Sequence, residues 1–146
     1  MLSLSPFVYG AFIFTVLLLA LTAYSLMGGL PLLILQHDVP LDARFVRAFF
    51  NAYYRVAFWL SVGAFLSYAL WGRWVFAVGA AGIASATALL RRHLLQRMRQ
   101  LGEQIEPGDT AAIGSFRRVH GAALLANLLL LAVVVAGVLR LSIEFS

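Results

Sequence analysis

The chain has 146 residues and no cysteine, and 62% of its residues are hydrophobic while only 12% are charged. A soluble domain carries about twice that charged fraction, and at this size its surface is too large to hide so much apolar area. The composition, with a mean hydropathy of +0.91, therefore indicates a membrane protein. It excludes disulfides, iron–sulfur clusters and cysteine nucleophiles within this chain.

A transmembrane helix needs about 20 mostly apolar residues, and four stretches of the chain meet that requirement. We expect helices over about 7–35, 43–71, 74–101 and 115–141. Their order predicts an all-α fold, in which residues 1–146 form a single domain: an integral membrane, antiparallel four-helix transmembrane bundle. No basic residue precedes the first apolar stretch, so we expect a retained helix and not a cleaved signal peptide.

The first two stretches carry recognisable helix signals. The first is longer than one span needs and holds Gly28, Gly29 and Pro31 near its end, so we expect a tilted or kinked helix there. Asp42 is the expected cap of the second helix. The segment Trp71–Trp74 predicts a tight turn with tryptophans at the membrane interface.

The third stretch is rich in small residues, which allow helices to approach closely in lipid. We therefore expect the tightest contacts of the bundle at Gly79, Gly82 and Ala86. Glu106-Pro107-Gly108-Asp109 should end this helix before the fourth, largely aliphatic one begins.

The arginines predict the orientation in the membrane. All eleven basic residues are arginines, and eight of them flank the connections between helices one and two and between helices three and four: Arg44, Arg47, Arg91, Arg92, Arg97, Arg99, Arg117 and Arg118. The positive-inside rule places these connections in the cytoplasm and both termini in the periplasm of a bacterial inner membrane. This distribution also argues against nucleic-acid binding, despite the net charge of +5.

A polar stripe enters the apolar layer along the second helix. Arg44, Arg47, Asn51 and Arg55 recur at helical spacing on one face. Arg55 should lie about 9 Å inside the apolar layer, at 1.5 Å per residue. Its long side chain can bend back to the headgroups, or it can line a polar pocket and attract an anion.

A second polar pair lies on the fourth helix, where His120 and Asn127 share a face. Each residue alone is explained by an interfacial position or a helix–helix hydrogen bond. Because intramembrane polar groups seek one another, we predict that Asn51, Arg55, His120 and Asn127 converge on a polar pocket in the cytoplasmic half. His120 could relay a proton there and Asn127 could orient it.

Cofactor signals are weak. His93 and His120 should lie at similar depth, and two facing histidines could ligate haem b. No zinc motif, phosphate loop or Ser-His-Asp arrangement is present. We therefore expect no metal site and no cofactor, with haem b as the alternative.

The segment Phe116-Arg117-Arg118-Val119-His120-Gly121, with Asn127 seven residues after the histidine, resembles the last helix of the transmembrane-protein-205-like family. Tyr53 and Tyr54 resemble the aromatic start of that family's second helix, and 29–31 its glycine and proline in helix one. Ala123 stands where the family often has a small hydroxyl residue. The resemblance implies a small four-helix membrane protein of unsettled function. The anthrone-oxygenase-like family has a similar layout.

Three functional classes follow from these patterns. The first is a non-enzymatic accessory or interaction module, with membrane lipid, other membrane subunits or a second copy as partners. The second is a membrane enzyme or redox protein that binds a lipophilic ligand such as a quinone or aromatic compound. A transporter is disfavoured, because the chain has neither inverted repeats nor an acidic residue at the membrane centre.

Overall fold

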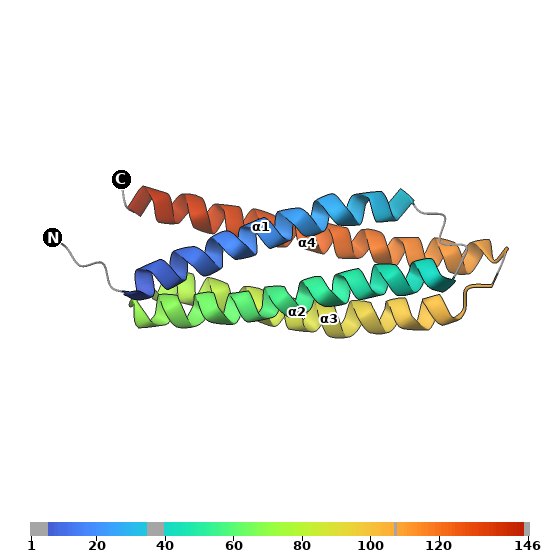
Figure 1. The fold of residues 1–146 in the computed structure, drawn as a ribbon, viewed down its shortest axis with the longest axis horizontal. Helices are drawn as coiled ribbons and strands as arrows, with labels where there is room; N and C mark the ends of the chain where they lie inside the picture. The colour runs from blue at the N-terminus through green and yellow to red at the C-terminus, as the bar shows by residue number, and fades with distance from the viewer. Residues whose placement is uncertain (1–5, 35–39, 107, 145–146) are drawn as a thin grey trace.

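The structure, a computed structural model, is an elongated bundle of antiparallel helices (Figure 1). It describes residues 6–34, 40–106 and 108–144. The four helices in these ranges are α1 (Pro6–Ile34), α2 (Pro40–Leu70), α3 (Trp74–Glu103) and α4 (Thr110–Glu144). Each helix packs against two neighbours, α1 lying between α2 and α4 and α3 completing the ring. The predicted all-α, four-helix architecture is confirmed.

Three of the helices are long and apolar enough to cross a membrane: α1, α3 and the Thr110–Ile143 part of α4. The α2 helix is long enough, at 31 residues, but its first half carries the arginine stripe and lowers its hydropathy. The start of α1 and the end of α4 lie at the same end of the bundle as the α2–α3 turn (Figure 1). The two arginine-rich connections therefore share the opposite end.

Two helices begin earlier than the sequence suggested. Pro40 opens α2, so Asp42 lies inside the first turn and does not cap it; a proline suits a first turn because its missing N–H would have no partner there. The fourth helix begins at Thr110, since the Asp109 carboxylate accepts bonds from the backbone N–H groups of Ala111 and Ala112, both at 3.1 Å. Asp109 therefore caps α4.

The predicted tight turn between α2 and α3 is confirmed. The N–H of Arg73 donates to the Tyr68 carbonyl at 2.9 Å and that of Gly72 to the Ala69 carbonyl at 3.0 Å, a pattern that closes the last turn of a helix. Gly72 has φ 81°, a conformation that side chains with a Cβ adopt at a cost. The Arg73 guanidinium lies 5.1 Å above the Trp71 ring.

The first helix stays continuous past the two glycines. Pro31 lies in the last turn of α1, where a proline removes a hydrogen bond from the end of the ladder and not from its middle. The helix therefore reaches Ile34 without a break.

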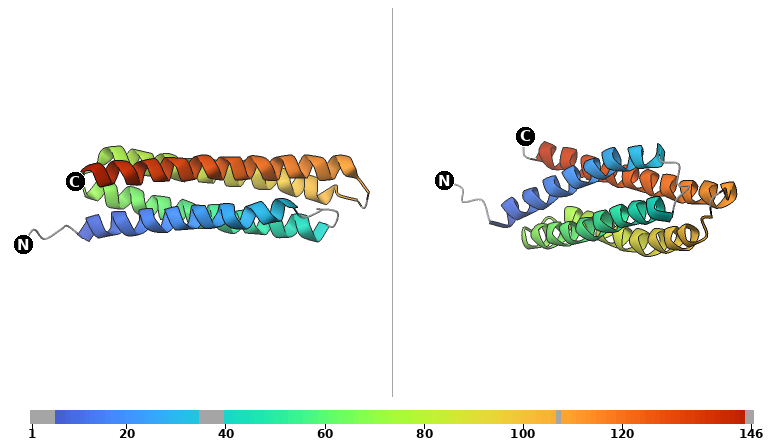
Figure 2. Two further views of the ribbon diagram at one scale, coloured as in Figure 1. Left: turned by 90° about the horizontal axis from the view of Figure 1, so that it is seen from above. Right: turned by 45° about the vertical axis from the view of Figure 1, so that its right-hand side comes forward.

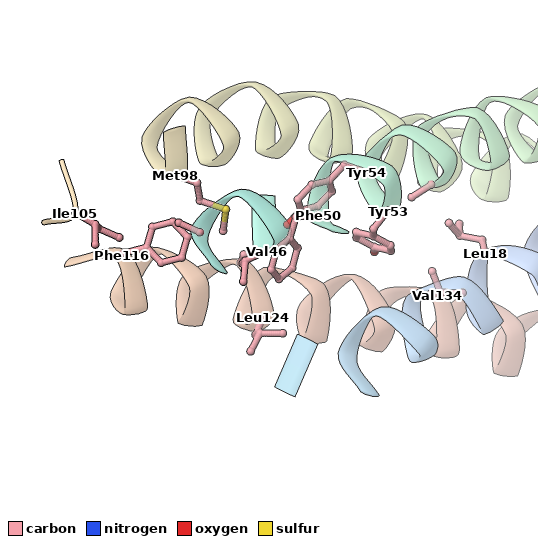
Figure 3. Close-up of a cluster of buried hydrophobic side chains, with 13 residues drawn as sticks. Leu18, Val46, Phe50, Tyr53, Tyr54, Met98, Ile105, Phe116, Leu124 and Val134 are labelled. Atoms are coloured by element: carbon pink, nitrogen blue, oxygen red, sulfur yellow. The ribbon is translucent and has the colours of Figure 1, made fainter. Parts of the chain in front are cut away.

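The core has an aromatic part and an alanine-rich part. In the half of the bundle near the α1–α2 and α3–α4 connections, Phe50, Tyr54 and Phe116 are fully buried and gather with Met98 and Leu124 between the helices (Figure 3). Toward the other end, small residues of α1, α2 and α3 surround Tyr68.

The prediction for the closest helix contacts is wrong. Gly79 and Gly82 are exposed, and a Cβ added to either would meet nothing within 4 Å; Ala86 is half-buried. The buried face of α3 instead carries Ala77, Ala80, Ala84 and Thr87. Small residues occupy both faces of α3, so their number could not show which face packs.

The closest approaches involve α1. A Cβ on Gly63 of α2 would lie 2.6 Å from the ring of Phe14. A Cβ on Gly29 would lie 2.5 Å from a methyl group of Leu124 on α4. Glycines in α1 and α2 therefore set the spacing of α1 against its two neighbours.

Candidate functional site

The structure divides the four predicted site residues into two pairs in separate environments. Asn51 and Arg55 line an open groove between α2 and α3. His120 and Asn127 are fully buried and bond to α1. The reason is that successive residues of a helix are rotated by about 100°. The side of α2 that faces the core is directed toward α4, whereas Asn51 and Arg55 lie on the neighbouring side, which faces α3.

Asn51 is fixed by a contact across the groove. The Nε of Arg91 on α3 donates to Oδ1 of Asn51 at 3.0 Å. A guanidinium has five N–H donors, so this bond leaves the two terminal NH₂ groups of Arg91 available. The bond thereby orients one arginine of α3 beside the arginine stripe of α2.

The groove follows the two helices over a long distance. One part, of about 630 Å³, is lined by Asn51, Arg55, Arg91 and Arg92. A second part, of about 570 Å³, shares Asn51 with the first and continues past Arg44, Arg47 and Arg99. The α2 and α3 ribbons lie side by side throughout (Figures 1 and 2). We call these two adjoining parts, with the six arginines that line them, the arginine groove.

The arginine groove carries far more positive than negative charge. Glu103 lies beside its outer end and approaches Arg99 at 3.4 Å, but both side chains are 68% exposed, so water screens the pair. Within the described residues, Arg44, Arg47, Arg55 and Arg92 make no hydrogen bond or ion pair. Among the described residues, the exposed Glu103 at the outer end is the one carboxylate that pairs with an arginine of the groove.

The inner end of the groove becomes apolar. Beyond Arg55 it is lined by Phe58, Trp59 and Ala88. The rings of Phe58 and Trp59 lie edge to face, 5.3 Å apart. The groove thus offers guanidinium groups at its outer part and aromatic rings at its inner end.

His120 is held in the core between α1 and α2. Its Nε2 lies 3.2 Å from the Gly29 carbonyl oxygen and must be the donor, because a carbonyl only accepts. The Phe50 ring meets the imidazole edge to face at 5.3 Å. These contacts give His120 a packing role on α4, close to the point where α1 and α4 approach at Gly29.

Asn127 joins a chain of buried hydroxyl groups. Its Nδ2 donates to the Ser25 hydroxyl at 3.2 Å, and Ser25 donates to the Thr22 carbonyl at 2.8 Å. Tyr53 donates to the Thr22 hydroxyl at 3.4 Å. The Asn127 Oδ1 and the Tyr54 hydroxyl are buried without a hydrogen-bond partner among the described residues.

The histidine pair considered for haem lies in two unlike environments. His93 is exposed on α3, whereas the imidazole of His120 is fully buried and bonded to α1. The described residues contain no group of three or more histidine, cysteine or carboxylate side chains that could hold a metal ion. The haem alternative gains no support from this arrangement.

Sequence reasoning missed the contribution of α3 to the groove. Arg91, Leu95 and Arg99 recur every fourth residue, so they share one face of that helix. This stripe has the same mixed character as the stripe on α2, and both begin near the same end of the bundle. Pairing the two stripes would have predicted the groove.

Comparison with known proteins adds no family. No family model, no curated protein and no solved structure matches this chain. The resemblance to the transmembrane-protein-205-like family therefore stays a prediction.

Proposed function

We propose that the chain is a multi-pass protein of a bacterial inner membrane, with both termini in the periplasm, and that it is a non-enzymatic module. In this proposal, the arginine groove binds the headgroups of anionic phospholipids of the cytoplasmic leaflet. The observation that carries the proposal is the cationic groove between α2 and α3, in which four of the six arginines have no partner among the described residues and which ends on aromatic side chains.

Membrane insertion of α2 follows from its neighbours. Because α2 packs between α1 and α3, which are apolar enough to span, it would enter the bilayer with them. Its second half exposes Trp59, Leu66 and Leu70, side chains suited to lipid. The arginines of its first half would then lie at the membrane surface and just below it.

The length of the groove suits a phospholipid. From Arg44 to Arg55 the helix rises by about 16 Å, whereas each headgroup layer is about 5–8 Å thick. Arg44 and Arg47 would lie among the headgroups, and Arg55 would reach the acyl region. A phosphate near Arg55 and Arg92 would neutralise charge at that depth, and its chains would pass along Phe58 and Trp59.

Lipid titration followed by native mass spectrometry tests this proposal on the full chain. The wild type should retain phosphatidylglycerol in preference to phosphatidylcholine. Changing Arg55→Gln together with Arg92→Gln should weaken phosphatidylglycerol binding by about 30-fold, since each arginine near an anionic lipid contributes about 1 kcal/mol.

The charge-matched control is Arg97→Gln with Arg118→Gln. Both arginines are exposed near the same end of the bundle, and neither lines the arginine groove. An equal loss of affinity in both double variants would contradict the proposal, because binding would then depend only on net charge.

A further inference from the structure

A separate cavity lies in the half of the bundle where α1 begins and α4 ends. It has a volume of about 260 Å³ and is bounded by all four helices. Leu18, Phe76, Ile83 and Val133 supply apolar walls, and Arg140 lies at its margin. The cavity shares no lining residue with the arginine groove, so it is independent of the function proposed above.

Two glycines create this space. Gly79 of α3 and Gly137 of α4 both line the cavity, and a Cβ at either position would meet nothing within 4 Å. In α1 and α2, by contrast, glycines permit close contact, as Gly63 does against Phe14. Here they leave a gap, which opens on the outer surface formed by α3 and α4.

The polar groups of the cavity belong to one end of it. The Thr15 hydroxyl donates to the Ala11 carbonyl at 2.7 Å, so its contact of 2.9 Å with the Tyr68 hydroxyl uses the proton of the tyrosine. Both hydroxyl protons are therefore committed within the protein. The remaining donor is the exposed guanidinium of Arg140, which makes no hydrogen bond or ion pair with any residue in 6–34, 41–106 and 108–143, where the structure describes the side chains.

We propose that this cavity binds one acyl chain of an anionic phospholipid, whose phosphate lies at Arg140. The lipid would come from the leaflet at the end where α1 begins. From Arg140 to Val133 the helix rises by about 10 Å, a large share of one leaflet of a hydrocarbon core about 30 Å thick. The positive charge therefore lies where the headgroup would be, and the apolar walls lie deeper, where the acyl chain would be.

A helix of a second copy does not fit. A helix is about 10 Å wide, so a 10 Å length of it fills several times the 260 Å³ of the cavity. An acyl chain is much thinner, and burial of its methylene groups against Leu18 and Ile83 would stabilise the complex. Arg140 would favour an anionic lipid, because the phosphate of such a lipid is not balanced by a positive charge in the same headgroup, as it is in phosphatidylcholine.

Photo-cross-linking tests the proposal. The full chain is placed in nanodiscs with phosphatidylglycerol that carries a diazirine in the middle of one acyl chain, and the labelled peptides are mapped. Labels should appear in 75–83 and 133–140. Gly79→Leu should reduce this labelling about tenfold, because each methylene that is excluded lowers affinity several-fold.

The matched control is Gly82→Leu, on the same helix at a position that is equally unoccupied and outside the cavity lining. It should keep the labelling, and Gly137→Leu should repeat the loss from the other wall. Arg140→Gln should remove the preference for phosphatidylglycerol over an identical phosphatidylcholine probe. The double variant Arg55→Gln/Arg92→Gln should leave these labels unchanged, which separates this site from the arginine groove.

Two results would overturn the proposal. One is labelling of 75–83 and 133–140 that is as strong in Gly79→Leu and Gly137→Leu as in the wild type. The other is equal labelling of the wild type by the two lipid probes, which would mean that Arg140 does not select the headgroup. The unfolding temperature of each variant in detergent shows whether the fold is kept.

Discussion

At the scale of single residues, the polar side chains of the core differ sharply from those of the groove. His120 and Asn127 bond to groups of α1, whereas Arg55 and Arg92 have no partner among the described residues. The sequence singled out Arg55, His120 and Asn127 but not Arg92, and it could not show that His120 and Asn127 bond to α1. Partners depend on the rotation of each helix about its axis, and α1 has almost no amphipathic pattern to set that rotation from sequence.

The role of Asn127 can be tested by removing its partner. Ser25→Ala would leave the Asn127 amide without an acceptor, and we expect a loss of about 1 kcal/mol in the free energy of unfolding, near the upper range for such bonds in membrane proteins. Thermal unfolding in detergent measures it.

Two further variants complete this test. Ser85→Ala removes a hydroxyl that bonds only to its own helix at an exposed position, so it should be neutral. Adding Asn127→Leu to Ser25→Ala should recover stability, because an apolar pair leaves no buried donor unbonded. Additive losses in the double variant would show that the two residues do not act together.

At the scale of the helices, the sequence predicted four elements and the turn between the second and third. It placed the start of the fourth helix too late because Asp109 was taken as part of the break, whereas its carboxylate caps the first turn. It also chose the wrong face of α3. Alanines at 77, 80 and 84 are buried, and the glycines beside them line open space.

The same substitution at two glycines tests this reassignment. Gly63→Leu should destabilise the bundle by about 1–3 kcal/mol, because the added side chain would overlap the Phe14 ring. Gly82→Leu should be neutral or slightly stabilising, since leucine favours a helix more than glycine does. If Gly82→Leu is the more damaging change in thermal unfolding, the packing described here is wrong.

At the scale of the whole molecule, the ends of the bundle differ in charge. Both connections rich in arginine lie at one end, and α1 begins and α4 ends at the other (Figure 1). Composition predicted this arrangement because apolar length and arginine position are properties of the sequence itself. The groove could not be predicted in the same way, since it requires two helices to present their stripes to each other.

Topology reporters test the orientation that follows. A fusion after Ser146 should report the periplasm, and a fusion at Gly108 should report the cytoplasm, because eight arginines flank the two connections on that side and two lie near the other. A periplasmic signal from Gly108 would reverse the orientation and move the arginine groove to the other leaflet.

Binding of anionic lipid in the arginine groove can be measured at Trp59, which lines the inner end of the groove. With Trp71→Phe and Trp74→Phe, Trp59 is the one remaining tryptophan. Its fluorescence is measured in bilayers that contain brominated phosphatidylglycerol or brominated phosphatidylcholine at equal fractions. We predict stronger quenching by the anionic lipid, and loss of that difference in Arg55→Gln/Arg92→Gln but not in Arg97→Gln/Arg118→Gln. Equal quenching by the two lipids in the parent protein would mean that the arginine groove does not select anionic lipid.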